Sequence, residues 1–264
     1  MKVKINLKYS VNKKLQDFLL TLPETFDRQG ETIFEGSRNT IKWYCVNDSD
    51  EVLKKVVVKR FRARNIFQQL AYSSFWKSKA QRAYENGLAL IGIDKVCTPY
   101  PIAYVEERSC GLLTYCYYLT AFTDASSVRS ELEIQPFNRP LAKAFALFIA
   151  SLHNRGIVHH DLNFSNVLFT EENGEYHISV IDINRMTVHP VGELQGGTSL
   201  LLCKDDFVRW TDDMQLFDYV MHEYARARQL NEETFLVKAH EMKRKHNLAW
   251  KRRKTLTSGL HIRR

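Results

Sequence analysis

The stretch that decides the fold is HHDLNFSNVL at residues 159–168, followed by VID at residues 180–182. An aspartate, Asp161, precedes an asparagine, Asn166, by five positions, and both come before a short apolar segment. A second aspartate, Asp182, ends the next apolar run. Transfer of a phosphoryl group from a magnesium nucleotide needs such a set: an acid that orients the attacking hydroxyl, and amide and carboxylate oxygens that bind the metal.

Each of these residues alone also fits a polar turn, because Asp and Asn side chains commonly hydrogen-bond their own backbone. The whole pattern is more specific, since its context fits the same chemistry. An apolar, helix-like segment at residues 141–153 precedes it, and Asp182 closes a β-rich run at residues 178–181. The sequence therefore predicts a phosphotransferase site that contains Asp161, Asn166 and Asp182.

Such a site also requires a strand lysine that holds the nucleotide phosphates, and a glutamate on the next helix that holds the lysine. Three valines at residues 56–58 lead into Lys59, which is typical of such a strand. Residues 64–90 have helix-forming composition, and Glu85 is their only acidic residue. We therefore expect a Lys59–Glu85 ion pair; the alternatives are a strand-end lysine and a helix-face glutamate that both lie in solvent.

Two glycines upstream of the lysine are candidates for nucleotide contact. Gly30 and Gly36 flank residues 31–35, and residues 38–44 read as the returning strand of a hairpin. The spacing is not the G-x-G-x-x-G of a phosphate-binding loop. Contact with phosphates and a role in tight turns therefore stay equally open for both glycines.

Length and composition agree with one catalytic unit of two lobes. The chain has 264 residues, of which 44% are hydrophobic, enough for a substantial core. It contains no run of about 18 apolar residues, and residues 1–8 alternate like a strand without the apolar region of a signal peptide. We therefore expect a cytoplasmic protein. The five cysteines lack C-x-x-C spacing, which favours buried free thiols over zinc or disulfides.

The order of the expected elements is coherent. Residues 1–62 look strand-rich, residues 64–91 helical, and residues 100–105 and 112–118 read as two further antiparallel strands. The second half is mainly helical, with the catalytic loop and a short hairpin between helices. These features predict the α+β class.

Positive charge is concentrated at the C-terminal end. The last 24 residues hold nine Lys and Arg residues against one acid, Glu241, so this end carries the whole net charge of +8. A cationic end attracts anionic lipid head groups or phosphorylated glycolipids, and residues 243–264 interleave apolar side chains that suit a membrane interface. The alternative is a basic helix that packs its apolar residues on the second lobe. Nucleic acid is not the favoured partner.

Departures from protein kinases narrow the substrate class. His160 stands where regulated protein kinases carry an arginine, Asn163 stands where Ser/Thr kinases carry a lysine, and Ile183 follows the metal aspartate in place of phenylalanine. No A-P-E sequence closes an activation segment. The chain therefore resembles the small-molecule and glycolipid kinases of the protein-kinase-like superfamily more than its peptide kinases.

Over residues 30–215 the chain is similar to the bacterial lipopolysaccharide kinases that phosphorylate Kdo or heptose in the inner core. The shared blocks are residues 57–61, 80–85, 98–103, 159–166 and 182–185. The resemblance implies a bilobal, protein-kinase-like fold. Its N-lobe, residues 1–120, would clamp the nucleotide with an antiparallel sheet and a helix; its mainly helical C-lobe, residues 121–264, would carry the catalytic loop, the metal site and the basic end.

The resemblance also implies the activity: a kinase that uses Mg²⁺ and ATP and acts on a sugar hydroxyl of a lipid A precursor, bound peripherally at the cytoplasmic face of the inner membrane. The implied roles are a hydroxyl-orienting group or general base for Asp161, magnesium ligands for Asn166 and Asp182, a phosphate clamp for Lys59 and its anchor for Glu85. For Arg185 two roles stay open, contact with a sugar carboxylate or phosphate and a buried structural pair. Two alternatives stay open, a protein tyrosine kinase or autokinase and a catalytically inactive binding module. The choice between Kdo and heptose also stays open.

Overall fold

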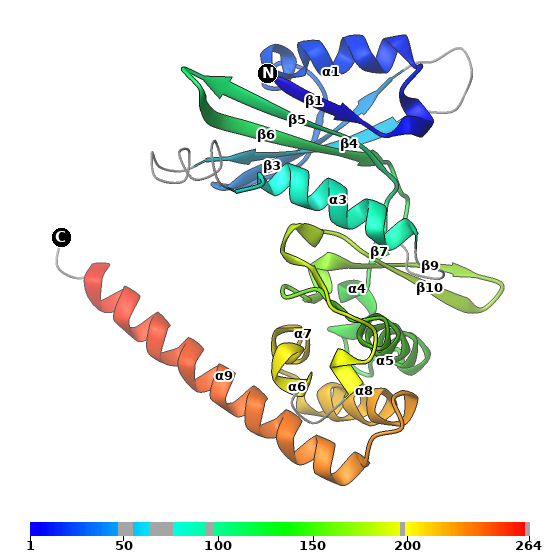
Figure 1. Cartoon of the computed structure of the whole chain (residues 1–264). Coiled ribbons are helices and arrows are strands. Elements are labelled where there is room, and N and C mark those ends of the chain that lie inside the picture. The colour runs from blue at the N-terminus through cyan, green and yellow to red at the C-terminus, as the bar shows by residue number, and fades with distance from the viewer. Residues whose placement is uncertain (47–54, 64–75, 93–97, 196–198, 262–264) are drawn as a thin grey trace. The chain divides into compact units, whose positions relative to one another are not determined.

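The computed structural model describes residues 1–46, 55–63, 76–92, 98–195 and 199–261, and for residues 195, 199 and 253–261 it describes the backbone alone. The chain divides into two compact units, residues 1–124 with 179–185, and residues 125–178 with 186–264. The first unit is strand-rich and the second mainly helical, as the α+β prediction required (Figure 1). The segment with Asp182 belongs to the first unit, whereas the predicted division at residue 120 put it with the second.

The first unit is built on a six-stranded sheet in the order β1-β5-β6-β4-β3-β2, in which neighbouring strands are antiparallel. The strands are β1 (Lys2–Ile5), β2 (Glu31–Glu35), β3 (Asn39–Cys45), β4 (Lys55–Arg62), β5 (Pro101–Ser109) and β6 (Leu112–Ala121). The structure thus confirms the expected hairpin between residues 31 and 44 and the two strands expected between residues 100 and 118.

Two helices cover opposite faces of this sheet (Figure 1). Side chains alternate between the faces along β4, so Val56 and Val58 pack in one core under α1 (Lys13–Thr25). On the other face lies α3 (Lys79–Ile91), where the rings of Tyr84 and Tyr104 are 5.4 Å apart. Lys59 follows Val58 and so belongs to the face that α3 covers.

Four strands, β1 to β4, confirm that residues 1–62 are strand-rich, and helix α1 is an element that the prediction lacked. Asn12 caps it, because its side-chain oxygen accepts a hydrogen bond from the backbone N–H of Leu15 at 2.8 Å. Leu15, Leu19 and Leu22 recur at helical spacing and are fully buried. A short 3₁₀ turn, η1 (Leu7–Tyr9), connects β1 to this helix.

The second unit is organised around three longer helices, α5 (Arg139–Asn154), α8 (Met214–Ala227) and α9 (Glu232–His261). Its shorter helices are α4 (Arg129–Leu132), α6 (Ser199–Leu202) and α7 (Lys204–Val208), with the 3₁₀ turns η2 (Phe164–Asn166) and η4 (Glu193–Gln195). Two small sheets, β10-β9-β7 and β11-β8, complete the strands that the structure describes. Their strands are β7 (Ser126–Ser127), β8 (Ile157–Val158), β9 (Val167–Glu172), β10 (Glu175–Val180) and β11 (Thr187–Val188). Helix α5 confirms the helix expected at residues 141–153.

The basic helix α9 begins as a packed helix and ends as an exposed one. Phe235, Ala239 and Met242 are buried. Lys243 is 4% exposed, and its ammonium group donates to the backbone carbonyl of Val208 at 2.9 Å and to that of Thr211. Further along, Leu248 and Trp250 are 51% and 56% exposed. No helix among the described residues combines the length and the apolar character needed to cross a bilayer.

The cysteine prediction is correct for half of the described thiols. Cys116 and Cys203 are buried, whereas Cys45 and Cys110 are exposed, and all four are free. Burial raises the pKa of Cys116 to about 11 and that of Cys203 to about 12, so both stay protonated at neutral pH. Cys97 lies outside the described residues.

Candidate active site

The predicted catalytic loop connects β8 to η2 in the second unit, and alternate apolar residues anchor it. Leu162 and Phe164 are fully buried. The ring of Phe164 lies 5.7 Å from the rings of both Phe145 and Trp210. Because these anchors point into the core, the polar residues between them stay at the surface of the unit.

A buried carboxylate, Asp206, fixes the backbone of this loop, and the sequence analysis did not identify it. Its two oxygens accept hydrogen bonds from the backbone N–H groups of His159 and His160, each at 2.7 Å. The imidazole of His153 lies 3.3 Å from the same carboxylate. Burial raises the pKa of Asp206, but its bonds to the two histidines 153 and 159 more than offset this effect, so the net pKa lies below its ordinary value. Burial lowers the pKa of His153. We conclude that Asp206 is an anion and His153 is neutral.

Hydrogen bonds within the loop orient the predicted site residues. The side-chain amide nitrogens of Asn166 and Asn163 donate to the backbone carbonyl of Asp161, at 2.9 and 3.1 Å. Since the amide nitrogen of Asn166 is used in this way, its amide oxygen is directed elsewhere and suits a cation. Asp161 and Asn166, five residues apart in the sequence, are therefore brought together as the motif predicts.

The carboxylate of Asp161 also contacts a base that the sequence analysis missed. The guanidinium group of Arg209 donates to Asp161 Oδ1 at 3.3 Å and to Asp205 Oδ1 at 3.2 Å. Its side chain and that of Asp161 are about one-third exposed, so the pair contributes little to stability. Arg209 thus places a positive charge directly beside the acid expected to orient the acceptor hydroxyl.

In the first unit the predicted phosphate lysine meets the predicted metal aspartate. Lys59 Nζ lies 2.6 Å from Asp182 Oδ1, and the side chains are 14% and 24% exposed. The amide nitrogen of Asn184 donates to the same oxygen at 2.6 Å. These contacts place the ammonium group and the carboxylate where both can meet phosphate oxygens carried by a metal.

Side chains from elsewhere in the first unit hold the Asp182 segment in place. Thr98 donates to the carbonyl of Val180 at 2.8 Å, and Asn86 of α3 donates to the carbonyl of Ile183 at 2.7 Å. Ile183 begins the turn η3 (Ile183–Arg185).

Two residues of the candidate site adopt a left-handed backbone conformation. The φ angle is +64° at His160 and +60° at Asp182. This conformation is costly for residues with a side chain, by about 1–3 kcal/mol, and it recurs where the surrounding structure fixes a functional group. Asp206 provides that constraint for His160, and the bonds to Val180 and Ile183 provide it for Asp182.

Glu85 does not pair with Lys59 in this structure. Its carboxylate accepts from Lys77 at 2.8 Å and from Gln81 at 2.9 Å, while Lys59 pairs with Asp182. Burial raises the pKa of Glu85, but the hydrogen bonds from Lys77 and Gln81 lower it by more, so the net pKa lies below its ordinary value. The geometry matches the alternative of a helix-face glutamate, and a role for Glu85 in nucleotide binding stays a prediction.

Basic residues of α3 lie near Asp182 where the glutamate was expected. Burial lowers the pKa of Lys79, and the charges of Arg185 and Arg82 lower it further, while Asp182 raises it. The Nε atom of Arg82 is buried and has no hydrogen-bond partner. Arg185, the predicted contact for an anionic sugar group, therefore belongs to a positively charged neighbourhood that suits phosphate or carboxylate oxygens.

The two candidate glycines lie at opposite ends of β2, so they do not belong to one loop. Gly30 has φ +79°, and a Cβ atom there would lie 2.5 Å from the ring of Tyr44. Gly36 lies in the β2–β3 turn, where its N–H donates to the carbonyl of Asn39 at 2.9 Å. The conformation of Gly30 favours the turn interpretation, and nucleotide contact by Gly36 stays a prediction.

The predicted metal ligands fit Mg²⁺ by their chemistry. An amide oxygen from Asn166 and a carboxylate from Asp182 are hard donors, and Mg²⁺ commonly takes only one or two protein ligands, with water and phosphates completing its shell. Within the described ranges, no three His, Cys, Asp or Glu side chains converge as a metal cage.

The fold and these residues define a protein of the protein-kinase-like class. The chain is similar to a solved structure described as WaaP in complex with acyl carrier protein, with a TM-score of 0.54 and 16% identity over 93% of this chain and 99% of that one. At this identity the likeness shows the fold. The model of the lipopolysaccharide kinase (Kdo/WaaP) family matches residues 24–191, well over half of the chain. The chain therefore belongs to the lipopolysaccharide kinase (Kdo/WaaP) family, which confirms the resemblance drawn from its sequence blocks. No curated protein matches it.

Proposed function

We propose that this chain transfers the γ-phosphoryl group of ATP, bound with Mg²⁺, to a sugar hydroxyl of Kdo or heptose in the inner core of lipopolysaccharide, on a lipid A precursor. The observation that carries the proposal is that the family match encloses the whole predicted set, Lys59, Asp161, Asn166 and Asp182. Family membership alone implies a kinase that uses ATP. The acceptor and the metal are the finer part of the proposal.

Each residue of the set has a role that its contacts support. Asp161 orients the acceptor hydroxyl and receives its proton, with its backbone carbonyl held by Asn166. Lys59 holds phosphate oxygens. Asn166 and Asp182 each supply an oxygen to Mg²⁺, which when bound neutralises charge on the phosphates.

Two basic features of the chain support an anionic glycolipid as the acceptor. Residues 243–264 would attract an anionic membrane surface, which supports a peripheral location at the cytoplasmic face. Arg185 would bind a sugar carboxylate or phosphate. Because Kdo carries a carboxylate and heptose does not, we take Kdo as the first acceptor to test.

The test is phosphate transfer by the purified protein from labelled ATP with magnesium, in parallel reactions that contain Kdo-bearing lipid A, a heptosylated precursor or no acceptor. We expect label on one glycolipid, and loss of label with Asp161→Ala although that variant still binds ATP. Label on protein alone would favour an autokinase. ATP binding without any transfer would favour an inactive binding module.

A further inference from the structure

An open groove of about 780 Å³ lies between α9 and the segment that connects α7 to α8. Arg209 and Asn163 line one end of it, and His246 and Trp250 of α9 line the other side. Arg209 donates to Asp161 Oδ1 at 3.3 Å. The groove therefore begins one side chain away from the acid that is proposed to orient the acceptor hydroxyl.

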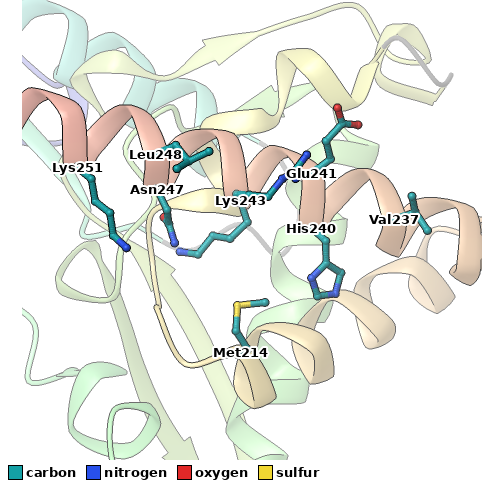
Figure 2. Close-up of a pocket in the computed structure, with 9 residues that line it drawn as sticks. Met214, Val237, His240, Glu241, Lys243, Asn247, Leu248 and Lys251 are labelled. Atoms are coloured by element: carbon teal, nitrogen blue, oxygen red, sulfur yellow. The ribbon is translucent and has the colours of Figure 1, made fainter.

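A second groove of about 690 Å³ lies between α8 and α9 (Figure 2). Figure 2 shows Met214 of α8 facing the side chains that α9 presents. Lys243, Asn247 and Lys251, four residues apart along α9, line both grooves. The two grooves therefore adjoin along this stripe of α9 side chains, and the surface that includes both is hereafter called the α9 groove.

The polar lining of the α9 groove near the catalytic loop favours an anion. Its acids there are already paired with bases: Asp212 with Lys243 at 3.3 Å, and Glu133 with Arg129 at 3.5 Å. Arg209 and Lys251 add positive charge to the same lining, and His246 adds an imidazole. Burial lowers the pKa of His246, as do the charges of Lys243 and Arg209, so its imidazole is neutral at neutral pH and offers an N–H donor. A carboxylate or phosphate bound here would meet several hydrogen-bond donors at once.

The same groove also presents apolar surface. Trp250 and Leu248 are 56% and 51% exposed, and Met214 is 40% exposed. Trp250 lines the half next to the catalytic loop, and the other two line the half between α8 and α9. A basic end and an apolar end in one groove match a ligand that carries both an anionic group and an apolar part. Aromatic faces such as that of Trp250 pack well on amphipathic groups.

We infer that the α9 groove binds the acceptor, an anionic glycolipid, with its sugar carboxylate or phosphate at Arg209, His246 and Lys251 and its less polar part along Trp250 and Leu248. The hydroxyl to be phosphorylated then lies beside Asp161. Arg209 is a positioning residue, because it contacts both the catalytic acid and the anionic group next to the reacting hydroxyl. This inference rests on the proposed function and assigns the acceptor site of the same reaction.

The test is steady-state kinetics of the full chain with detergent-dispersed, Kdo-bearing lipid A as acceptor, together with equilibrium binding of the same glycolipid without ATP. The variant is Lys251→Glu in the groove. The matched control is Lys238→Glu, which makes the same charge change on the same helix at an exposed side chain outside the groove and outside residues 243–264. We expect Lys251→Glu to raise the KM for acceptor and the binding Kd at least about tenfold, because a carboxylate then faces the anionic group of the glycolipid, with the KM for ATP unchanged. The control should change neither.

The outcomes separate this inference from the proposed function. Equal KM and Kd values in both variants would overturn the groove assignment while transfer itself still supports the kinase. Groove-dependent binding without transfer would keep the acceptor site and overturn the kinase. The last measurement is binding of both variants to vesicles of phosphatidylglycerol. If both variants lose vesicle binding equally and neither loses affinity for the glycolipid, the basic residues of α9 bind a membrane surface without the glycolipid. The inference then fails.

Discussion

The catalytic loop of the second unit and the lysine strand of the first differ in how their residues are held. Around the loop, Asp206 is fully buried and bonds two successive backbone N–H groups. Lys59 depends on a partly exposed pair with Asp182, and its expected partner Glu85 lies with Lys77. The difference teaches that the catalytic loop is fixed through its backbone N–H groups, by a buried carboxylate that is distant in the sequence. A pair between a strand and a helix depends on which helix face turns toward the strand.

Substitution of the buried carboxylate should give the largest effect. Asp206→Ala leaves two buried N–H groups without an acceptor, so we expect the free energy of unfolding to fall by about 3–5 kcal/mol. Asp205→Ala is the matched control, because its partly exposed pair with Arg209 is worth less than about 1 kcal/mol. Urea denaturation measures both. Equal losses in the two variants would show that the buried carboxylate of Asp206 stabilises the loop no more than the partly exposed pair of Asp205 with Arg209 does.

The second comparison separates the two residues that sequence analysis paired. Lys59→Ala should lower kcat/KM for ATP by at least about 100-fold, because a charge on the transferred phosphates is lost. Glu85→Ala should change it by less than about twofold, since its partners are Lys77 and Gln81. Steady-state kinetics at saturating acceptor provides the values. A loss with Glu85→Ala as large as that with Lys59→Ala would instead indicate that the pair forms during turnover.

The glycines at the two ends of β2 should separate stability from nucleotide affinity. Gly30→Ala forces a side chain into the left-handed region and against Tyr44, so we expect a loss of about 1–2 kcal/mol in unfolding free energy with an unchanged KM for ATP. At Gly36 a Cβ meets the exposed ring of Phe34, which can move, and lies at ordinary contact distance, 3.5 Å, from the carbonyl of Asn39. The fold should therefore tolerate Gly36→Ala while the KM for ATP rises. Thermal unfolding and ATP titration test both. The reverse pattern would assign phosphate contact to Gly30.

The buried network should also make stability fall in mild acid. Burial keeps the pKa of His153 in the folded chain below its ordinary value. As the pH drops below about 6.5, the unfolded chain therefore takes up a proton at this residue before the folded chain does. The free energy of unfolding then decreases by at most about 1.4 kcal/mol per pH unit for this group. Asp206, whose folded pKa is also lowered, adds a further loss only near its unfolded pKa of about 3.9. Unfolding between pH 7 and 5 should show a smaller slope in His153→Gln, but not in the exposed control His177→Gln. An unchanged slope in His153→Gln would argue against a neutral His153.

Sequence reasoning recovered what is encoded by neighbours along the chain. The loop motif predicted that Asp161 and Asn166 lie in one site, and the structure adds the bond from the Asn166 amide to the Asp161 carbonyl. Strand patterns predicted most of the sheet. It missed α1, although Asn12 caps the helix and Leu15 follows at the expected spacing, because the flanking segments read as strands. The cap residue and the helical spacing of the leucines were therefore a signal in the sequence that could have predicted α1.

Long-range partners could not be predicted in the same way. Asp206 bonds a backbone N–H 47 positions away, and Arg209 reaches Asp161 48 positions away. The one local hint was an acid flanked by apolar Phe207 and Val208, which indicates burial but names no partner. Glu85 shows the opposite error, since being the only acid of its segment did not fix the side of the helix on which it lies.

The attachment of Lys243 has a mechanical consequence for α9. Its ammonium group is held by the carbonyls of Val208 and Thr211 about a third of the way along the helix. From there to His261 the helix runs about 27 Å, at 1.5 Å per residue. A change of about 10° in the direction of the helix axis at Lys243 would displace the far end by about 5 Å. The buried ammonium group of Lys243, together with the buried side chains of Phe235, Ala239 and Met242, thus fixes the direction in which the basic end projects.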